Sequence, residues 1–440
     1  MIRRPLKSLR SLNPDAGPLQ TVRSRRIIHY ATFLLLFLAL GTCAVHAQLV
    51  RLLVKPKPAF ALADWKSRLN AQTPVLARKL PGLPLQFIQV PGDHAEAVLA
   101  QLRQDPSVEY AERDGLARAA FVPADTTLTG TEWHLAKIQA PQAWTITAGR
   151  TNTIVAVLDS GIDAAHPDLA SRVLPGFNFV SGDTDTADDF GHGTAVAGVV
   201  VAAGNNSLGI LGVSRGCLVM PVKVVDATGY AYYSAVAQGI HYAVDNGARV
   251  INISIAGNDA SLTLQEAVDY ASSNNVLVVA AAGNNGNNLP QYPAACSGVL
   301  AISATETNDT LAPFSSSGSF IALAAPGDNI WTTQASATAP YGAWRGTSFS
   351  SPIVAGTAAL ALSVNPLLSS TQLVALLEQN ADDLGAPGFD ESFGYGRVNA
   401  SRAVTAAAAL RSKPPAPPQF VQVTGLRCAN LFQTSRIREH

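Results

Sequence analysis

The sequence predicts an α/β protein built on a doubly wound, mostly parallel sheet. Two continuous apolar runs, 154–158 and 276–282, end in polar or glycine turns, as strands buried on both faces require. Two segments rich in small apolar residues, 193–203 and 353–362, fit buried helices packed closely against their neighbours. The chain has 440 residues, 48% hydrophobic and 14% charged, which allows one large α/β domain with smaller appendages.

The charge distribution gives no sign of a nucleic-acid partner. The formal net charge is zero, and Lys and Arg cluster mainly in the first 26 residues. An apolar run at 31–40 and small residues at 45–47 follow that basic stretch, which is typical of a signal peptide at 1–47. We therefore expect a secreted protein, extracellular or periplasmic, with no stable membrane association after cleavage. An uncleaved anchor and lipidation at Cys43 are weaker alternatives, because the run is short and Thr42 matches a lipoprotein signal poorly.

Residues 48–120 predict a small α+β unit. Its strand-like segments are 49–54 and 85–90, and its helix-like segments are 61–70 and 94–103. A unit that contains a βαβ element fits this order. From these residues alone, a small binding domain is an alternative.

The last segment, 411–440, predicts no folded domain. Its proline-rich stretch at 414–418 predicts a stiff, extended linker. The residues after this linker are too few for a core of their own. The tail could be removed, disordered, a sorting signal or the remnant of an accessory domain.

Three segments carry an acid, a base and a nucleophile, in that order along the chain. Asp159 closes the first apolar run, His192 stands at the entrance of a small-residue helix, and Ser348 follows a glycine turn at the start of another. A serine hydroxyl is a weak nucleophile, so a histidine must take its proton and a carboxylate must orient the histidine. Taken singly, the three residues could be a turn cap, a structural histidine and an N-cap. Their order and flanking sequences favour catalysis at the carboxyl rim of the sheet.

These three segments resemble the catalytic blocks of the subtilisin-like serine proteases, and residues 132–410 follow that family, with 131–144 similar to its thermitase branch. The resemblance implies a subtilisin-like three-layer fold for a catalytic domain at 125–410. It also implies a serine endopeptidase that hydrolyses polypeptide substrates through an acyl-enzyme. Ser348 would be the nucleophile, His192 the general base and then acid, and Asp159 the group that holds the histidine tautomer.

A fourth block, the strand that ends in Gly283 and Asn284, resembles the family's oxyanion segment. The Asn284 amide and the Ser348 backbone N–H would together stabilise the oxyanion. Without the resemblance, this Gly-Asn pair predicts a simple turn.

Two further segments resemble the edges that pair with an extended peptide substrate by strand addition. On the edge at 229–233, Tyr233 would cover a more distant substrate pocket. Without the resemblance, 250–257 would be another core strand, and Tyr230 and Tyr232 would be generic surface residues. Ala256 stands where the family usually has glycine and would narrow the pocket for the residue before the cut bond. The apolar pockets imply broad cleavage after hydrophobic or aromatic residues. The implied substrate-binding residues are Ser254, Ile255, Ala256, Gly257, Gly283, Gly229 and Tyr233.

The segment 107–114 resembles the closing strand of the family's inhibitory propeptide, a small ferredoxin-like α+β unit. Residues 48–120 would then be an intramolecular inhibitor and folding template. The enzyme would remove this unit autocatalytically, by a cut between Asp114 and Thr127, and act as a monomer.

Calcium is the one metal that the resemblance implies, in a structural role. Asp168 and Asn206 match family ligands, with carbonyl oxygens near Leu208 and Ile210 completing the site. An acidic loop before His192 either holds a second calcium or is simply solvated; its members are Asp183, Asp185, Asp188 and Asp189. No zinc motif is present, so we expect no catalytic cofactor.

The cysteines and two departures from the family pattern complete the prediction. Cys217 and Cys296 could form a disulfide in an exported protein, but the sequence does not fix their separation. Ala195 and Phe349 replace the usual histidine and methionine, and neither position transfers a proton. A catalytically silent peptide-binding protein and a selective processing protease are the alternatives; the first would have lost a catalytic residue, and none is lost.

Overall fold

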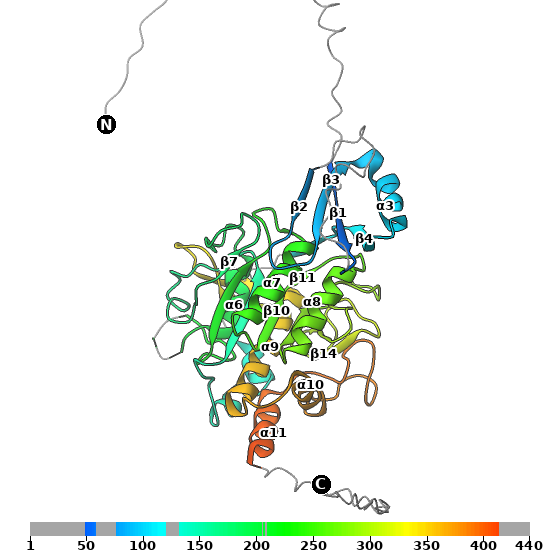
Figure 1. The fold of residues 1–440 in the computed structure, drawn as a ribbon. Helices are drawn as coiled ribbons and strands as arrows, with labels where there is room; N and C mark the ends of the chain where they lie inside the picture. Colours follow the sequence, from blue (N-terminus) through cyan, green and yellow to red (C-terminus); the bar gives the residue numbers. More distant parts are fainter. Residues whose placement is uncertain (1–48, 59–75, 120–131, 205, 207–208, 413–440) are drawn as a thin grey trace, which may run out of the picture. The chain divides into compact units, whose positions relative to one another are not determined.

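The computed structural model describes residues 49–58, 76–119, 132–204, 206 and 209–412, all within one compact unit that begins at Leu49. We call residues 49–119 the small unit and residues 132–412 the large unit (Figure 1). The predicted signal peptide, the helix expected at 61–70, the part of the expected cleavage region from 120 to 127, and the tail beyond 412 lie outside the described residues.

A seven-stranded parallel sheet forms the centre of the large unit, in the order β14-β13-β12-β10-β6-β8-β7. Its first strand along the chain, β6, lies inside the sheet, and later strands add on both sides, which is doubly wound topology. The predicted α/β class is therefore confirmed. The strands are β6 (Ile154–Asp159), β7 (Phe177–Asn178), β8 (Leu218–Lys223), β10 (Val250–Ile253), β12 (Leu277–Ala281), β13 (Val299–Thr305) and β14 (Ile321–Pro326).

Helices cover both faces of this sheet, because successive strand residues point to opposite sides. Val155 and Val157 of β6 join the core cluster that contains α6 and α9, whereas Ala156 and Leu158 join the cluster that contains α7 and α8. The first face holds α4 (Trp133–Lys137), α5 (Ala140–Trp144), α6 (His192–Val201), α9 (Thr347–Val364), α10 (Ser370–Gln379) and α11 (Ala400–Ser412). The second holds α7 (Tyr233–Asp245) and α8 (Leu262–Ser273). The result is a three-layer fold.

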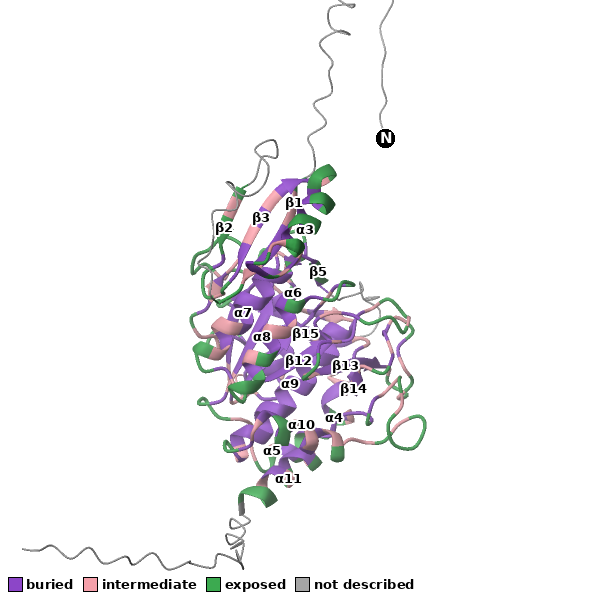
Figure 2. Ribbon diagram, turned by 45° about the vertical axis from the view of Figure 1, so that its right-hand side comes forward, coloured by how far each residue is buried: buried purple, intermediate pink, exposed green. Residues whose placement is uncertain are grey.

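The central helix α9 is buried along nearly its whole length, and Figure 2 shows it in the buried colour with β12 and β13. Among the described residues it is the one helix long and apolar enough to cross a membrane by composition, and 94% of it is buried inside the protein. Pro352 lies within its second turn and cannot donate a backbone N–H to the carbonyl of Ser348. The Ser254 hydroxyl donates to that carbonyl instead, at 2.9 Å.

The small unit is a four-stranded antiparallel sheet in the order β2-β3-β1-β4. Its elements are β1 (Leu49–Pro56), β2 (Leu76–Lys79), β3 (Gln86–Pro91), the 3-10 turn η1 (Gly92–His94), α3 (Ala95–Gln104) and β4 (Val108–Arg113). Leu52 and Ile88 of the sheet pack with Val98 and Leu102 of α3. This strand order is the one that the ferredoxin-like prediction requires.

Three shorter strands connect the two units, and one hairpin completes the fold. The strand β5 (Leu116–Ala119) lies between β9 (Tyr230–Tyr232) and β11 (Ile255–Ala256), antiparallel to both. The hairpin consists of β15 (Ile330–Thr333) and β16 (Tyr341–Trp344). The strand β5 follows β4 directly and belongs to the small unit, although its partners belong to the large unit.

Candidate active site

The strand β6 and the helix α6 bring Asp159 and His192 into contact. Asp159 ends the strand, His192 begins the helix, and both side chains are fully buried. The Oδ1 atom of Asp159 lies 2.8 Å from Nδ1 of His192 and also accepts a hydrogen bond from the Ser160 N–H at 2.8 Å. The carboxylate therefore fixes one ring nitrogen of the histidine and the plane of its imidazole.

Ser348 lies in the first turn of α9, beside the start of α6. The His192 ring packs edge-on against Phe349, the next residue after Ser348, with centroids 5.6 Å apart. The Ser348 hydroxyl donates to the carbonyl oxygen of Ser254 at 2.9 Å. The structure thus gathers the predicted acid, base and nucleophile at the ends of β6, α6 and α9. Phe349, directly after Ser348, is fully buried and packs against the imidazole of His192.

The side chain of Asn284, after β12, has one end fixed and one end available. Its Oδ1 atom accepts from the Thr347 N–H and from the Thr347 hydroxyl, each at 2.9 Å. Its Nδ2 atom is buried and has no hydrogen-bond partner within the described ranges. Thr347 also accepts from the Gly283 N–H at 3.1 Å. Sequence reasoning missed this anchoring role of Thr347, for which its hydroxyl immediately before Ser348 was the available signal.

The two predicted substrate edges do face an extended strand, and that strand is β5 of the small unit. Ile255 and Ala256 on one edge pair with Ala119 and Arg118. On the other edge, the Ala119 N–H donates to the carbonyl of Gly229 at 3.0 Å. Along β5 the buried side chains are those of Ala117 and Ala119, while Leu116 and Arg118 point outward to solvent. The groove between the edges is therefore filled by a segment of the chain itself.

Tyr233 lies beneath this strand, because its side chain is 1% exposed and begins α7 in the core of the second face. A Cβ added to Gly115 would stand 2.5 Å from Cε2 of Tyr233, and one added to Gly257 would stand 2.3 Å from its hydroxyl. Tyr230 and Tyr232, by contrast, are 42% and 38% exposed. Tyr233 forms the floor of the groove, with glycine backbone directly above its ring.

Asp168 and Asn206, the predicted calcium ligands, lie in contact. Asp168 is fully buried; its Oδ1 accepts from the Asn206 amide at 2.6 Å and its Oδ2 accepts from the Ile210 N–H at 3.1 Å. Burial, together with the charge of Asp168, raises the pKa of Glu132 to about 7. Carboxylate and amide oxygens are the ligand type that calcium takes, but here both carboxylate oxygens of Asp168 accept from N–H groups, so the structure itself shows no cation site among these described residues. Leu208 lies outside the described residues, and within the described part no group of three His, Cys, Asp or Glu converges.

The acidic loop before His192 is internally bonded. Asp183 and Asp185 each accept from a backbone N–H two residues later, and Asp189 pairs with Lys223. Asp188 accepts several hydrogen bonds at the start of α6. These contacts order the loop, and both alternatives from the sequence, a second calcium and a solvated loop, stay predictions.

Cys217 and Cys296 are both free and buried, and they lie in core clusters on opposite faces of the sheet. The disulfide considered from the sequence is therefore not formed. The layered fold separates the two residues, which the linear sequence could not reveal.

The fold and the comparisons with known proteins identify a serine endopeptidase of the subtilisin-like class, and the chain belongs to the subtilase family. Residues 150–396, more than half of the chain, match the subtilase family (peptidase S8) model. Thermitase of Thermoactinomyces vulgaris is 40% identical over 284 residues, which cover 64% of this chain and 99% of that protein. The thermophilic serine proteinase of Bacillus sp. strain AK1 is 36% identical over 353 residues (78% and 86%), and subtilisin E of Bacillus subtilis strain 168 is 40% identical over 309 (69% and 76%). The predicted thermitase-like membership of the family is thus confirmed.

Proposed function

We propose that Asp159, His192 and Ser348 form the catalytic triad of this endopeptidase. The observation that carries the proposal is the buried 2.8 Å contact between Asp159 and His192, beside the helix start that holds Ser348. With Nδ1 directed at the carboxylate, Nε2 is the nitrogen that takes the Ser348 proton as the hydroxyl attacks a peptide carbonyl. The same nitrogen then gives the proton to the leaving amine, and a water hydrolyses the acyl-enzyme.

The proposed oxyanion donors are Nδ2 of Asn284 and the backbone N–H of Ser348. Thr347 occupies the amide oxygen of Asn284, so the NH₂ end is the one presented to a ligand. A donor held in place before the reaction needs no reorganisation when the carbonyl oxygen gains charge. A side-chain donor of this kind contributes about 3–4 kcal/mol to the barrier reduction.

Substrate polypeptides are proposed to bind as β5 does, as an extended strand between β9 and β11. Backbone pairing reads no side chain, so it supports broad specificity. Ser254, Gly257 and Gly283 would line the path of the peptide near Ser348, and Ala256 would narrow the pocket for the residue before the cut bond. We propose a preference for hydrophobic or aromatic residues there.

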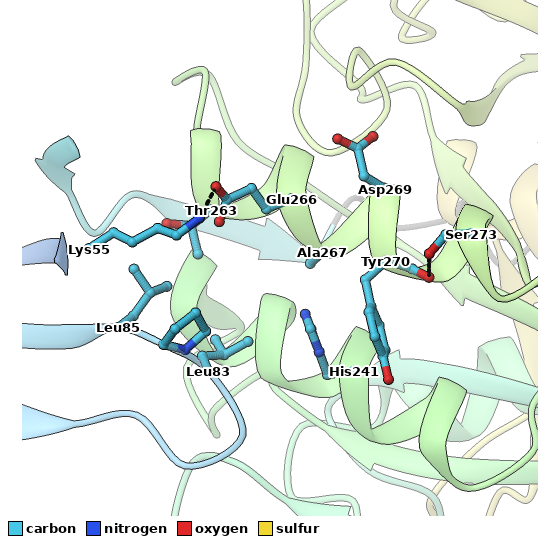
Figure 3. Close-up of a pocket in the computed structure, with 11 residues that line it drawn as sticks. Lys55, Leu83, Leu85, His241, Thr263, Glu266, Ala267, Asp269, Tyr270 and Ser273 are labelled. Atoms are coloured by element: carbon cyan, nitrogen blue, oxygen red, sulfur yellow. Dashed lines mark hydrogen bonds and ion pairs between the residues drawn. The ribbon is translucent and has the colours of Figure 1, made fainter. Parts of the chain in front are cut away.

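The small unit is proposed to be an inhibitory propeptide at 48–120, because β5 occupies the groove and β4 anchors it. Glu112 accepts from the Leu262 and Thr263 N–H groups at the start of α8, at 3.0 and 3.1 Å. Figure 3 shows a second contact of the small unit with α8, in which Lys55 of β1 pairs with Glu266 of α8 beside a cavity of about 470 Å³. That cavity lies between the small unit and the helices α7 and α8, and Leu83 and Leu85 line it.

The remaining assignments are proposed on the sequence pattern and the family. Residues 1–47 act as a signal peptide for a secreted enzyme, 125–410 form the catalytic domain, and 411–440 form a linker and tail. The enzyme matures autocatalytically and works as a monomer. Structural calcium would be held by Asp168, Asn206 and nearby carbonyl oxygens, and it would stabilise the folded state without entering the reaction.

The test combines labelling and turnover. Purified mature protein should react with a serine-directed phosphonate, and peptide mapping should place the label on Ser348. The same protein should hydrolyse casein. A well-folded protein that neither labels nor cleaves would overturn the proposal, and peptide binding without turnover would support the silent binding protein instead.

A further inference from the structure

The carboxylate of Asp188, which the proposed mechanism does not use, gathers five hydrogen bonds at one point. Its Oδ1 accepts from the Ser160 hydroxyl at 2.7 Å, from the Gly191 N–H at 2.7 Å and from the Phe190 N–H at 3.2 Å. Its Oδ2 accepts from the N–H and the hydroxyl of Thr194, at 2.8 and 2.6 Å. Charge-assisted bonds of this kind are stronger than neutral ones, so the loop and the helix start are held at the carboxylate.

The position of this carboxylate matters because α6 begins at His192. The residue before the helix, Gly191, has a left-handed φ of 95° and offers no side-chain acceptor to the exposed N–H groups of the first turn. Asp188 and Ser160 supply the acceptors instead: Thr194 donates to Asp188, and the Gly193 N–H donates to Ser160 Oγ at 2.9 Å. A negative charge at this end of a helix is also favoured by the helix dipole.

The same contacts reach the other member of the acid–base pair. Ser160 directly follows Asp159, gives its N–H to the Asp159 carboxylate and gives its hydroxyl to Asp188. Asp188 therefore joins the end of β6 to the start of α6 through a single side chain. The two elements are in close contact, since a Cβ added to Gly193 would stand 2.1 Å from the carbonyl oxygen of Gly161.

We propose that Asp188 is a positioning residue for His192, and this inference depends on the proposed triad. Its carboxylate fixes the start of α6 relative to the end of β6, and thereby holds the imidazole of His192 on Asp159. Its effect should fall on the chemical step, because the substrate edges β9 and β11 make none of these contacts.

The test measures kcat and KM per active site, counted by titration with the serine-directed phosphonate. Asp188→Ala should lower kcat by about 10- to 100-fold with KM within about twofold, because a small displacement of a reacting group costs rates of this size. Asp188→Asn, which keeps one acceptor oxygen, should lose less. A role in folding alone would reduce the number of titratable sites and leave kcat per site unchanged.

Asp185→Asn is the matched control, because Asp185 is exposed in the same loop and accepts locally from the Ala187 N–H. It should keep kcat within twofold, which separates positioning from loss of loop charge or of a calcium ligand. If Asp188→Ala does not fold, Ser160→Ala tests the same connection and should lower kcat in the same direction. The inference fails if the tested variant keeps its kcat, if KM alone rises, or if Asp185→Asn is equally slow. An unlabelled and inactive wild-type protein would instead overturn the proposed function.

Discussion

The helices of the large unit obtain acceptors for their first N–H groups in two different ways. At α6, the acceptors Asp188 and Ser160 belong to the large unit itself. At α7, the small unit supplies one: Asp114 accepts from the N–H and the hydroxyl of Ser234, at 3.0 and 2.7 Å. The comparison teaches that the large unit holds the helix of its proposed base unaided. By contrast, the small unit supplies side-chain acceptors to the first N–H groups of α7 and α8, the helices that follow the two groove edges.

The two completed helices are not equivalent. The helix α8 has its own N-cap, since the Ser261 hydroxyl accepts from the Leu264 N–H at 3.2 Å, and Glu112 adds to this cap. The residue before α7, Tyr232, provides no side-chain acceptor. The start of α7 therefore depends more on the small unit than the start of α8 does.

The largest expected effect comes from removing the proposed nucleophile, a change that leaves both kinds of helix start intact. Ser348→Ala should lower casein hydrolysis on the order of 10⁶-fold, which is the loss measured for a subtilisin that lacks its catalytic serine. If maturation is autocatalytic, the small unit should stay covalently attached, which mass measurement of the purified chain would show. Normal processing of this variant would identify an external protease and contradict self-maturation.

The next effect is confined to the large unit. Asn284→Ala removes the Nδ2 donor and should lower kcat by about 10²–10³-fold with little change in KM, because the oxyanion forms only along the reaction. Steady-state kinetics on a peptide substrate would measure both constants. A rise in KM at constant kcat would instead place the Asn284 amide against the ground-state substrate.

Local sequence predicted the elements that carry the proposed triad, because each lies in a long apolar segment with a polar end. It did not predict the contacts of Asp114, Glu112, Asp188 or Thr347. The partners of Asp114 and Glu112 lie 120 and about 150 positions away, and no local pattern encodes such pairings. Asp188 looked like one of four equivalent loop acids, and its contacts with Ser160 after β6 and with Thr194 in α6 distinguish it only in the folded chain.

A third prediction addresses the start of α7 directly. The Asp114 side chain is fully buried between Ser234 and Arg51, whose guanidinium lies 2.9 Å away. Asp114→Asn places an NH₂ group among these donors and should weaken the hold of the small unit by about 2 kcal/mol, roughly 30-fold in affinity. After the maturation cut, activity should therefore appear earlier than in the wild type, followed with a fluorogenic peptide.

Two further variants complete that experiment. Glu112→Gln should have the smaller effect, since α8 keeps Ser261. Asp93→Asn alters a carboxylate of the small unit that is 72% exposed, and it should match the wild type. Equal effects of all three variants would contradict the distinction between the two helix starts.

The last effect, which is absent at neutral pH, is a pH dependence of the stability of the large unit, due to His134 in α4. Burial lowers the pKa of this imidazole to about 3, and Nδ1 has no partner within the described residues. The folded protein keeps it neutral, whereas the unfolded chain takes up a proton below about pH 6.5. Stability is therefore lost as the pH falls from about 6.5 towards 3, by about 1.4 kcal/mol per unit. Glu132 acts oppositely, because burial raises its pKa to about 7. The folded protein therefore favours the protonated carboxyl group, and the stability that this gives is lost as the pH rises from about 4.5 to 7.

Because the two residues oppose each other, the effect of His134 must be measured as a difference between two proteins. The two proteins compared are Ser348→Ala and the double variant Ser348→Ala with His134→Leu, and urea unfolding measures their stability at pH 7.5 and 5.0. The Ser348→Ala background prevents autolysis, and Glu132 is present in both proteins. On going from pH 7.5 to 5.0, the protein that keeps His134 should lose about 2 kcal/mol more unfolding free energy than the His134→Leu protein. This is the cost of keeping the imidazole neutral about 1.5 pH units below its pKa in the unfolded chain. Since α4 belongs to the large unit, the difference should persist whether or not the small unit is attached. Parallel stability changes in the two proteins would show that His134 is solvated in the folded state, and would remove this residue from the acid sensitivity of the large unit.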